Sequence, residues 1–208
     1  MQRLLLLLAA SLIAAPAVAG DAPLLRPARD VVVQYGTGGA TLAAGTTVTM
    51  HFTRQGRLIR IDPATGTAYT VYDTDANHMM IVRTDARTFE DRTSDPSQIP
   101  LYFTPDATFV KTGTDTIAGQ RCTTYDATLH ARKGQICLTD DGVILRARTG
   151  QADTFREMVA VTVSYTEQPL ALFAPPPGFE NADSLSGKPS RRPMQSFFES
   201  PGRPAGAR

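Results

Sequence analysis

The sequence predicts a mainly β protein with little helix, built on a curved antiparallel sheet or half-open barrel. Apolar and polar residues alternate in nearly every periodic segment. Glycine, proline, asparagine and aspartate separate these segments at short intervals, as they do between short strands. No amphipathic segment has the length of a helix. A curved sheet is the economical architecture, because an antiparallel sheet must bury one apolar face.

The N-terminus has the pattern of a secretory signal peptide, covering residues 1–19. A short basic start precedes an apolar run from Leu4 to Ala15, and Ala17-Val18-Ala19 is a small-residue cleavage site. The run is short for a membrane span, which needs about 20 residues, so an uncleaved anchor is the weaker alternative. We expect cleavage after Ala19 and export, to the periplasm in a Gram-negative bacterium.

The first half of the domain is expected to be a meander of short strands. Alternation places Val48, Met50 and Phe52 on one face of their strand. Gly36 to Gly39 is expected to end the first strand, and Gln55-Gly56 to form a tight turn. The strands expected here are residues 31–35, 46–54, 57–62, 67–73, 77–83 and 87–91.

The second half repeats this pattern. Lys133-Gly134 and Asp140-Asp141-Gly142 are expected to be hairpin turns. Residues 21–30 and 91–107 carry several prolines and are expected to be loops. The strands expected here are residues 109–117, 122–129, 135–138, 143–148 and a long last strand over 155–167.

Cys122 and Cys137 are the only cysteines in the chain. In an oxidising compartment an even number of cysteines is normally paired, and these two lie on neighbouring expected strands. The spacing is not that of a Cys-x-x-Cys redox or zinc motif, and no histidine lies at ligand spacing beside either cysteine. We expect a structural disulfide worth roughly 3 kcal/mol. A labile disulfide, a metal site and free thiols remain open.

The domain is expected to cover residues 20–181 and to be followed by a disordered tail, residues 182–208, rich in Pro, Ser, Gly and Arg. Phe197-Phe198 in this tail is either incidental or a short docking motif. The formal net charge of the whole chain is +1, and the tail is basic while the body is slightly acidic. An acidic body makes nucleic acid an improbable partner.

Four segments, in order, carry a family resemblance: LRPARDVVVQY, GRLIRID, VKTGTDTIAGQRCTTYDA with GQICLTDDG, and LALFAPPPGFE. Across roughly residues 24–180 the chain resembles a bacterial family of exported proteins of unknown function within the lipoprotein-carrier-like superfamily. The resemblance implies a half-open antiparallel barrel whose concave face holds acyl chains or other apolar ligands. It brings no catalytic residues with it.

No residue pattern indicates catalysis or a cofactor. The chain lacks a Gly-x-Ser-x-Gly elbow and any plausible Ser, His and acid set. Met50-His51 and His78-Met79-Met80 suggest copper ligands, but neighbours in a strand point to opposite faces. The paired acids Asp140 and Asp141 are explained by a turn. We therefore expect no enzyme activity, no metal and no cofactor.

Two functions are weighed here, and metal binding or an enzyme of a kind that no motif reveals is kept as a third alternative. The first is a non-catalytic periplasmic binding or carrier protein for a lipid or acyl chain on the concave sheet face. The second is an envelope adaptor that docks a protein partner or a membrane surface through a sheet edge or the basic tail. A deep apolar groove favours the first, and a closed core with an exposed strand edge favours the second. The predicted ligand lining is Val48, Met50, Phe52, Ile59, Ile61, Val71, Met79 and Ile81.

Overall fold

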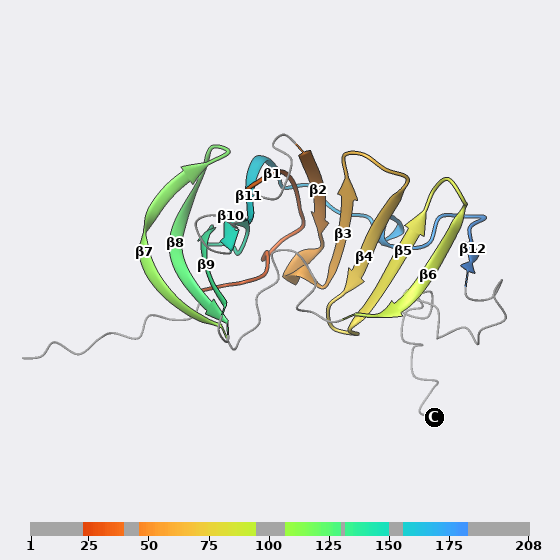
Figure 1. Cartoon of the computed structure of the whole chain (residues 1–208), viewed down its shortest axis with the longest axis horizontal. Helices are drawn as coiled ribbons and strands as arrows, with labels where there is room; N and C mark the ends of the chain where they lie inside the picture. Colours follow the sequence, from red (N-terminus) through yellow and green to blue (C-terminus); the bar gives the residue numbers. More distant parts are fainter. Residues whose placement is uncertain (1–22, 40–45, 95–106, 130–131, 150–155, 183–208) are drawn as a thin grey trace, which may run out of the picture.

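A single sheet of twelve strands forms the described part of the protein in a computed structural model (Figure 1). The structure describes residues 23–39, 46–94, 107–129, 132–149 and 156–182. The sheet is open, and this part of the chain contains almost no helix; its two 3-10 turns are η1 at Arg54–Gly56 and η3 at Leu170–Phe173. The mainly β fold expected from the sequence is confirmed.

The strands follow one another as two meanders. The N-terminal half contains β1 (Val31–Gly39), β2 (Thr46–Phe52), β3 (Leu58–Pro63), β4 (Ala68–Asp73), β5 (His78–Arg83) and β6 (Thr88–Thr93). The C-terminal half contains β7 (Thr108–Ile117), β8 (Gln120–Leu129), β9 (Arg132–Leu138), β10 (Ile144–Thr149) and β11 (Arg156–Ser164). A last short strand, β12 (Glu180–Asn181), follows η3.

The two halves meet at the centre of the sheet, where β1 lies between β2 and β11. The order across the sheet is β12-β6-β5-β4-β3-β2-β1-β11-β10-β9-β8-β7. All pairs among the described strands are antiparallel except β12 with β6, which is parallel. Strand β7 therefore forms one end of the sheet and β12 the other, as Figure 1 shows.

Two glycine-containing segments expected to interrupt strands lie inside strands. Gly36 to Gly39 continues β1, because pairing with β2 and β11 satisfies its backbone groups. Lys133 and Gly134 belong to β9, opposite Thr128 and Ala127. Glycine is needed at 134 for close approach rather than for a turn, since a Cβ there would lie 2.8 Å from the carbonyl oxygen of Arg148.

Other turn predictions are confirmed. Gln55 and Gly56 connect β2 to β3 with φ values of 64° and 58°. Gly142 turns the chain into β10 with φ 89°. Strand β6 runs to Thr93, beyond the expected end, and β11 stops at Ser164 rather than continuing to 167. From there residues 165–181, here called the strap, cross the N-terminal half to the far edge, shown in blue in Figure 1.

The largest core cluster draws residues from both halves of the sheet, because the sheet is strongly curved. Tyr35 from β1, Met50 from β2 and Leu145 from β10 are all buried in it. A second cluster lies under the strap, and a third lies in the C-terminal half.

The expected disulfide joins Cys122 of β8 to Cys137 of β9, with 5.4 Å between the Cα atoms. The register pairs Cys137 with Thr124, so the two cysteines occupy diagonal positions on the same face. Both are buried, with 2% and 0% of their surface exposed, as expected of a structural bridge. A disulfide of this kind fits an exported protein.

Candidate functional site

The strand register gathers seven of the eight predicted lining residues on one face of the N-terminal half. Met50 pairs with Ile61 and Phe52 with Ile59, while Val48 shares their face by alternation. The pairing continues from Ile59 through Tyr72 to Met79, and from Ile61 through Thr70 to Ile81. This surface is called the inner face.

Val71 lies on the opposite face. It pairs with Arg60 of β3 and Met80 of β5, and it packs in the cluster under the strap with Phe173. Alternation within β4 is ambiguous, because both Val71 and Tyr72 are buried, with 0% and 8% exposed. The assignment of Val71 to the inner face was therefore wrong.

The inner face is already largely filled by the protein's own core. Met50, Phe52 and Ile59 have 0%, 7% and 5% of their surface exposed. The half-buried members are Val48, Ile61, Met79 and Ile81. Binding of a ligand by these residues stays a prediction.

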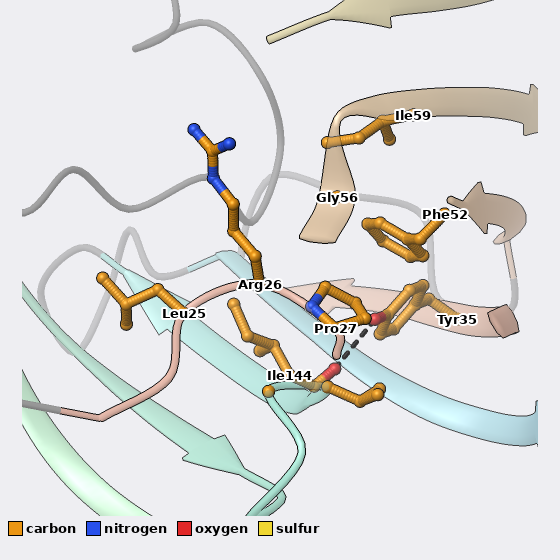
Figure 2. A pocket seen from close by; sticks show the side chains of 10 residues that line it. Leu25, Arg26, Pro27, Tyr35, Phe52, Gly56, Ile59 and Ile144 are labelled. Atoms are coloured by element: carbon orange, nitrogen blue, oxygen red, sulfur yellow. Dashed lines mark hydrogen bonds between the residues drawn. The ribbon is translucent and has the colours of Figure 1, made fainter. Parts of the chain in front are cut away.

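A small pocket lies beside Phe52 and Ile59 (Figure 2). Its free volume of about 20 Å³ accommodates roughly one water molecule. The Tyr35 hydroxyl donates a hydrogen bond of 2.8 Å to the Ile144 carbonyl in its wall, which joins β1 to β10. Burial raises the pKa of this tyrosine, so it stays protonated in the folded protein. The pocket is too small for an acyl chain.

Residues 25–27, which precede β1, form one wall of this pocket. The amide of Ala28 donates to the Asp141 carbonyl at 2.8 Å, and the amide of Gln55 donates to the Pro27 carbonyl at 2.7 Å. Gly142 permits the close approach, because a Cβ there would lie 2.2 Å from the carbonyl oxygen of Arg26. Residues 25–27 are thus held between the β2–β3 turn and the turn before β10.

Asp30 joins three parts of the chain. Its two carboxylate oxygens accept hydrogen bonds from the amides of Arg54 and Gln168, each at 2.7 Å. Next to it, the guanidinium of Arg29 contacts Asp141 at 3.1 Å and stacks on the ring of Tyr165 at 3.5 Å. The start of the strap is thereby tied to both halves of the sheet.

A polar cluster holds the strap on the outer face of β2 and β3. His51 Nδ1 lies 2.9 Å from Gln168 Oε1, and Arg60 donates at 3.0 Å to the Leu172 carbonyl. Arg60 also binds Asp62 through both of its carboxylate oxygens. Met50 and His51 point to opposite faces, as expected from strand alternation.

The second histidine of interest, His78, lies at the strap's far end. Its Nε2 atom is 3.3 Å from Asp91 Oδ1, and the Asp91 side chain is fully buried. Burial lowers the pKa of His78, against the opposing effect of Asp73. Within the described ranges no three His, Cys, Asp or Glu side chains are arranged to hold a metal ion.

The most exposed strand is β7, at the free end of the sheet. It pairs with β8 alone among the described strands, and Val110 on it is 64% exposed. A register shift between Lys111 and Gly113 and the lysine itself protect the edge from indiscriminate pairing. Sequence reasoning named no residue here, although the threonine-rich stretch 108–117 lacks alternating apolar residues and so signals a poorly covered strand.

Two further predictions fall outside this description. The signal peptide of residues 1–19 and the greater part of the tail, residues 183–208, lie outside the described residues. Within the part that is described, no helix has the length and apolar character needed to cross a membrane.

Comparison with known proteins gives similarity of fold. An uncharacterized conserved protein from Thermus thermophilus is 11% identical, with a TM-score of 0.52 over 74% of this chain and 90% of that one. MucB in the MucA/MucB complex of Pseudomonas aeruginosa is 13% identical, with a TM-score of 0.45 over 67% of this chain and 53% of that one. PNGF-II is 8% identical, with a TM-score of 0.46 over 82% of this chain and 32% of its own. No protein-family model and no curated protein matches the sequence.

Proposed function

We propose that this protein is a non-catalytic binding protein of the bacterial envelope that docks an extended segment of a partner protein at the free edge of β7. The observation that carries the proposal is the ten-residue edge strand, whose side chains are mostly exposed. An edge strand offers unpaired backbone donors and acceptors, and an extended segment pairs with them by strand addition. The predicted export and the disulfide are consistent with the periplasm.

The closed core supports docking at an edge over storage of a ligand. Four of the eight predicted lining residues are core residues, three on the inner face and Val71 under the strap, and the pocket beside Phe52 and Ile59 holds about one water. The inner face and the pocket therefore leave little apolar volume for a guest. Among the described strands β7 pairs with β8 alone, so a segment added at its other side would displace none of the described strand pairs.

Photo-crosslinking in producing cells tests this proposal. A photo-reactive amino acid replaces Val110 on β7, and the matched control replaces Val161 on β11, which is 54% exposed. We expect a discrete crosslinked partner from position 110 and none from position 161. Equal crosslinking from both positions, or none from position 110, contradicts docking at β7.

The captured partner is then purified and its affinity measured. Val110→Lys places a charge at the edge and is expected to weaken binding at least tenfold, whereas Val161→Lys leaves it unchanged. Melting temperatures of both variants show whether the fold is intact.

A second candidate function is binding of a lipid or acyl chain on the inner face. The half-buried apolar residues Val48, Ile61, Met79 and Ile81 favour it, because they share one face of neighbouring strands. Native mass spectrometry of protein purified from the periplasm, before and after organic extraction, tests it. A reproducible co-purifying lipid supports the carrier function.

The burial of each lining residue decides whether it can be substituted to test lipid binding without disrupting the core. Charged substitutions of Met50 or Phe52 would disrupt the core, since these side chains are 0% and 7% exposed. Ile61→Ser and Ile81→Ser change half-buried positions instead. Loss of a co-purified lipid in these folded variants supports the lining, and full retention contradicts it.

A further inference from the structure

Strand β7, at the free end of the sheet in Figure 1, is divided in two by the register shift between Lys111 and Gly113. At the shift the Thr112 hydroxyl donates to the Thr124 carbonyl of β8 at 3.2 Å. A bulge of this kind bends a strand and interrupts its ladder, so one straight segment pairs best with the residues on one side of it. The two stretches differ in the side chains that they present to such a segment.

The second stretch, residues 113–117, offers little by which one partner sequence could be told from another. Its only charged side chain, Asp115, is already bound, because Arg146 donates to its carboxylate at 2.9 Å and the amide of Thr116 donates at 2.7 Å. The other exposed side chains of this stretch are those of Thr114 and Thr116. Threonine discriminates weakly between neighbours, so specificity does not arise here.

The first stretch, residues 108–111, presents two apolar side chains and one positive charge. Val110 is 64% exposed, and Phe109 is half-buried in edge-to-face contact with Tyr125, with 6.3 Å between the ring centroids. Lys111 is exposed, and no salt bridge between described residues includes it. This stretch therefore carries the features that a partner can recognise.

The register with β8 fixes the faces on which these side chains lie. Phe109 and Lys111 share one face two positions apart, and Val110 lies on the other. An added antiparallel strand places one of its residues directly opposite each of them. Opposite charges in such a pair stabilise the sheet and like charges destabilise it. Lys111 thus selects an acidic residue, while Phe109 and Val110 select apolar ones.

We propose that the partner segment pairs antiparallel with residues 108–111 and carries, in this order, one acidic and two apolar residues. The acid lies opposite Lys111, and the apolar residues lie opposite Val110 and then Phe109. The order follows because the direction of the added strand is opposite to that of β7, so it meets position 111 first. This inference rests on the proposed docking at β7 and adds to it the chemistry of the segment that docks.

A phage-displayed library of random peptides is the probe, selected on the full chain as wild type, Lys111→Glu and the matched control Lys133→Glu. Lys133 is an exposed lysine of β9, two strands from β7, so the control makes the same change of charge away from the edge. Both substitutions are at exposed positions, and melting temperatures show whether the variants are folded. We expect wild type and Lys133→Glu to select the acidic–apolar–apolar order. Lys111→Glu should select a basic residue in place of the acid.

A synthetic copy of a peptide selected by wild type measures the size of the effect. Its affinity should fall at least about fivefold for Lys111→Glu and stay unchanged for Lys133→Glu. Replacing the acid of the peptide by lysine should restore binding to Lys111→Glu, as expected of two groups in direct contact. Alanine at either apolar position of the peptide should weaken binding, a test that leaves the protein itself unaltered. Equal affinity of the original peptide for wild type and Lys111→Glu overturns the inference.

Amide hydrogen exchange separates failure of this inference from failure of the docking on which it rests. A peptide that protects amides of residues 108–117 without preferring an acid overturns the proposed order of residues and leaves docking at β7 in place. A selection that yields no peptide protecting these amides also overturns the inference. Docking itself is then judged by the crosslinking from position 110, which uses the natural partner and depends on no peptide.

Discussion

The two halves of the sheet are stabilised by different means. The N-terminal half is covered by the strap on its outer face, and its inner face contributes Met50, Phe52, Ile59 and Tyr72 to the largest core cluster. The C-terminal half carries the disulfide between β8 and β9 and ends in the exposed strand β7. The N-terminal half gains stability from apolar burial under the strap, whereas the β8–β9 hairpin adds to its own buried core a covalent link that restricts its unfolded state.

The half that the strap stabilises is therefore not the half that leaves a strand open for binding. The covered half exposes little edge, and a partner must displace the strap to reach its outer face. The disulfide lies two strands or fewer from β7, so the half with the open edge is the half that is stapled. Substitutions that remove the strap's main anchor or the disulfide measure how strongly each half depends on that feature.

The largest effect is expected from Phe173→Ala in the covered half. A fully buried phenylalanine leaves a cavity when truncated, which costs about 3–5 kcal/mol. Denaturant unfolding of this variant and of Leu170→Ala measures the difference, and the exposed control should change by less than about 0.5 kcal/mol. A loss below about 1 kcal/mol for Phe173→Ala would mean that the strap contributes little to the fold.

The next effect is expected in the stapled half. The cysteines are 15 residues apart, and replacing both by alanine should lower the free energy of unfolding by about 3 kcal/mol. Wild type unfolded in a reductant should match the double variant. If instead reduction leaves the denaturation midpoint in place, the hairpin does not need its covalent link.

A smaller effect is expected at the Tyr35 hydrogen bond, one of several contacts between the halves. Tyr35→Phe removes the hydrogen bond to the Ile144 carbonyl and should cost about 1 kcal/mol at neutral pH. Burial raises the pKa of Tyr35 above its ordinary value of 10.0, so folding favours the protonated form. Stability from this group is present below pH 10 and is lost as the pH rises above it.

The alkaline arm of the stability curve measures this contribution. Wild type should lose stability more steeply than Tyr35→Phe above about pH 10, when both are unfolded in denaturant at a series of pH values. Parallel curves for the two proteins would show that Tyr35 ionises equally easily in the folded and unfolded states.

The smallest effect is expected at His78, at the outer end of the covered half. Burial lowers its pKa below the ordinary value of 6.5, so the unfolded chain binds the proton more readily. Its contribution is present above pH 6.5 and is lost as the pH falls through that value toward the lower folded pKa. His78→Gln should therefore have a flatter stability profile between about pH 7 and pH 5, with an unchanged profile at higher pH. A steeper profile in the variant would reverse the sign of this assignment.

Much of the fold follows from local pattern. Alternation located the strands, and the turn residues at Gln55-Gly56 and Gly142 marked two hairpins correctly. Local pattern failed at Gly36–Gly39 and at Gly134, where a partner strand rather than the residue decides the conformation. Glycine is compatible with both turn and strand, so its role depends on what lies beside it.

The candidate sites depended more on contacts between distant residues. Alternation placed seven lining residues on one face correctly. The position of Val71 on the opposite face follows only from its register with Arg60 and Met80. Strand periodicity also cannot say how much of an apolar face the protein fills itself. The exposure of Val110 depends on the place of β7 at the end of the sheet, which the local sequence does not specify.

The sequence by itself determined a mainly β chain, a pair of cysteines on adjacent strands and the positions of most turns, because these depend on neighbours along the chain. The tertiary structure decided that β1 pairs with β11, that the strap covers β3–β6 and that β7 is left at the edge. The contacts behind them join distant residues, some more than a hundred positions apart, such as Tyr35 with Ile144 and Arg60 with Leu172. Periodicity within one segment carries no information about which distant segment will pack against it.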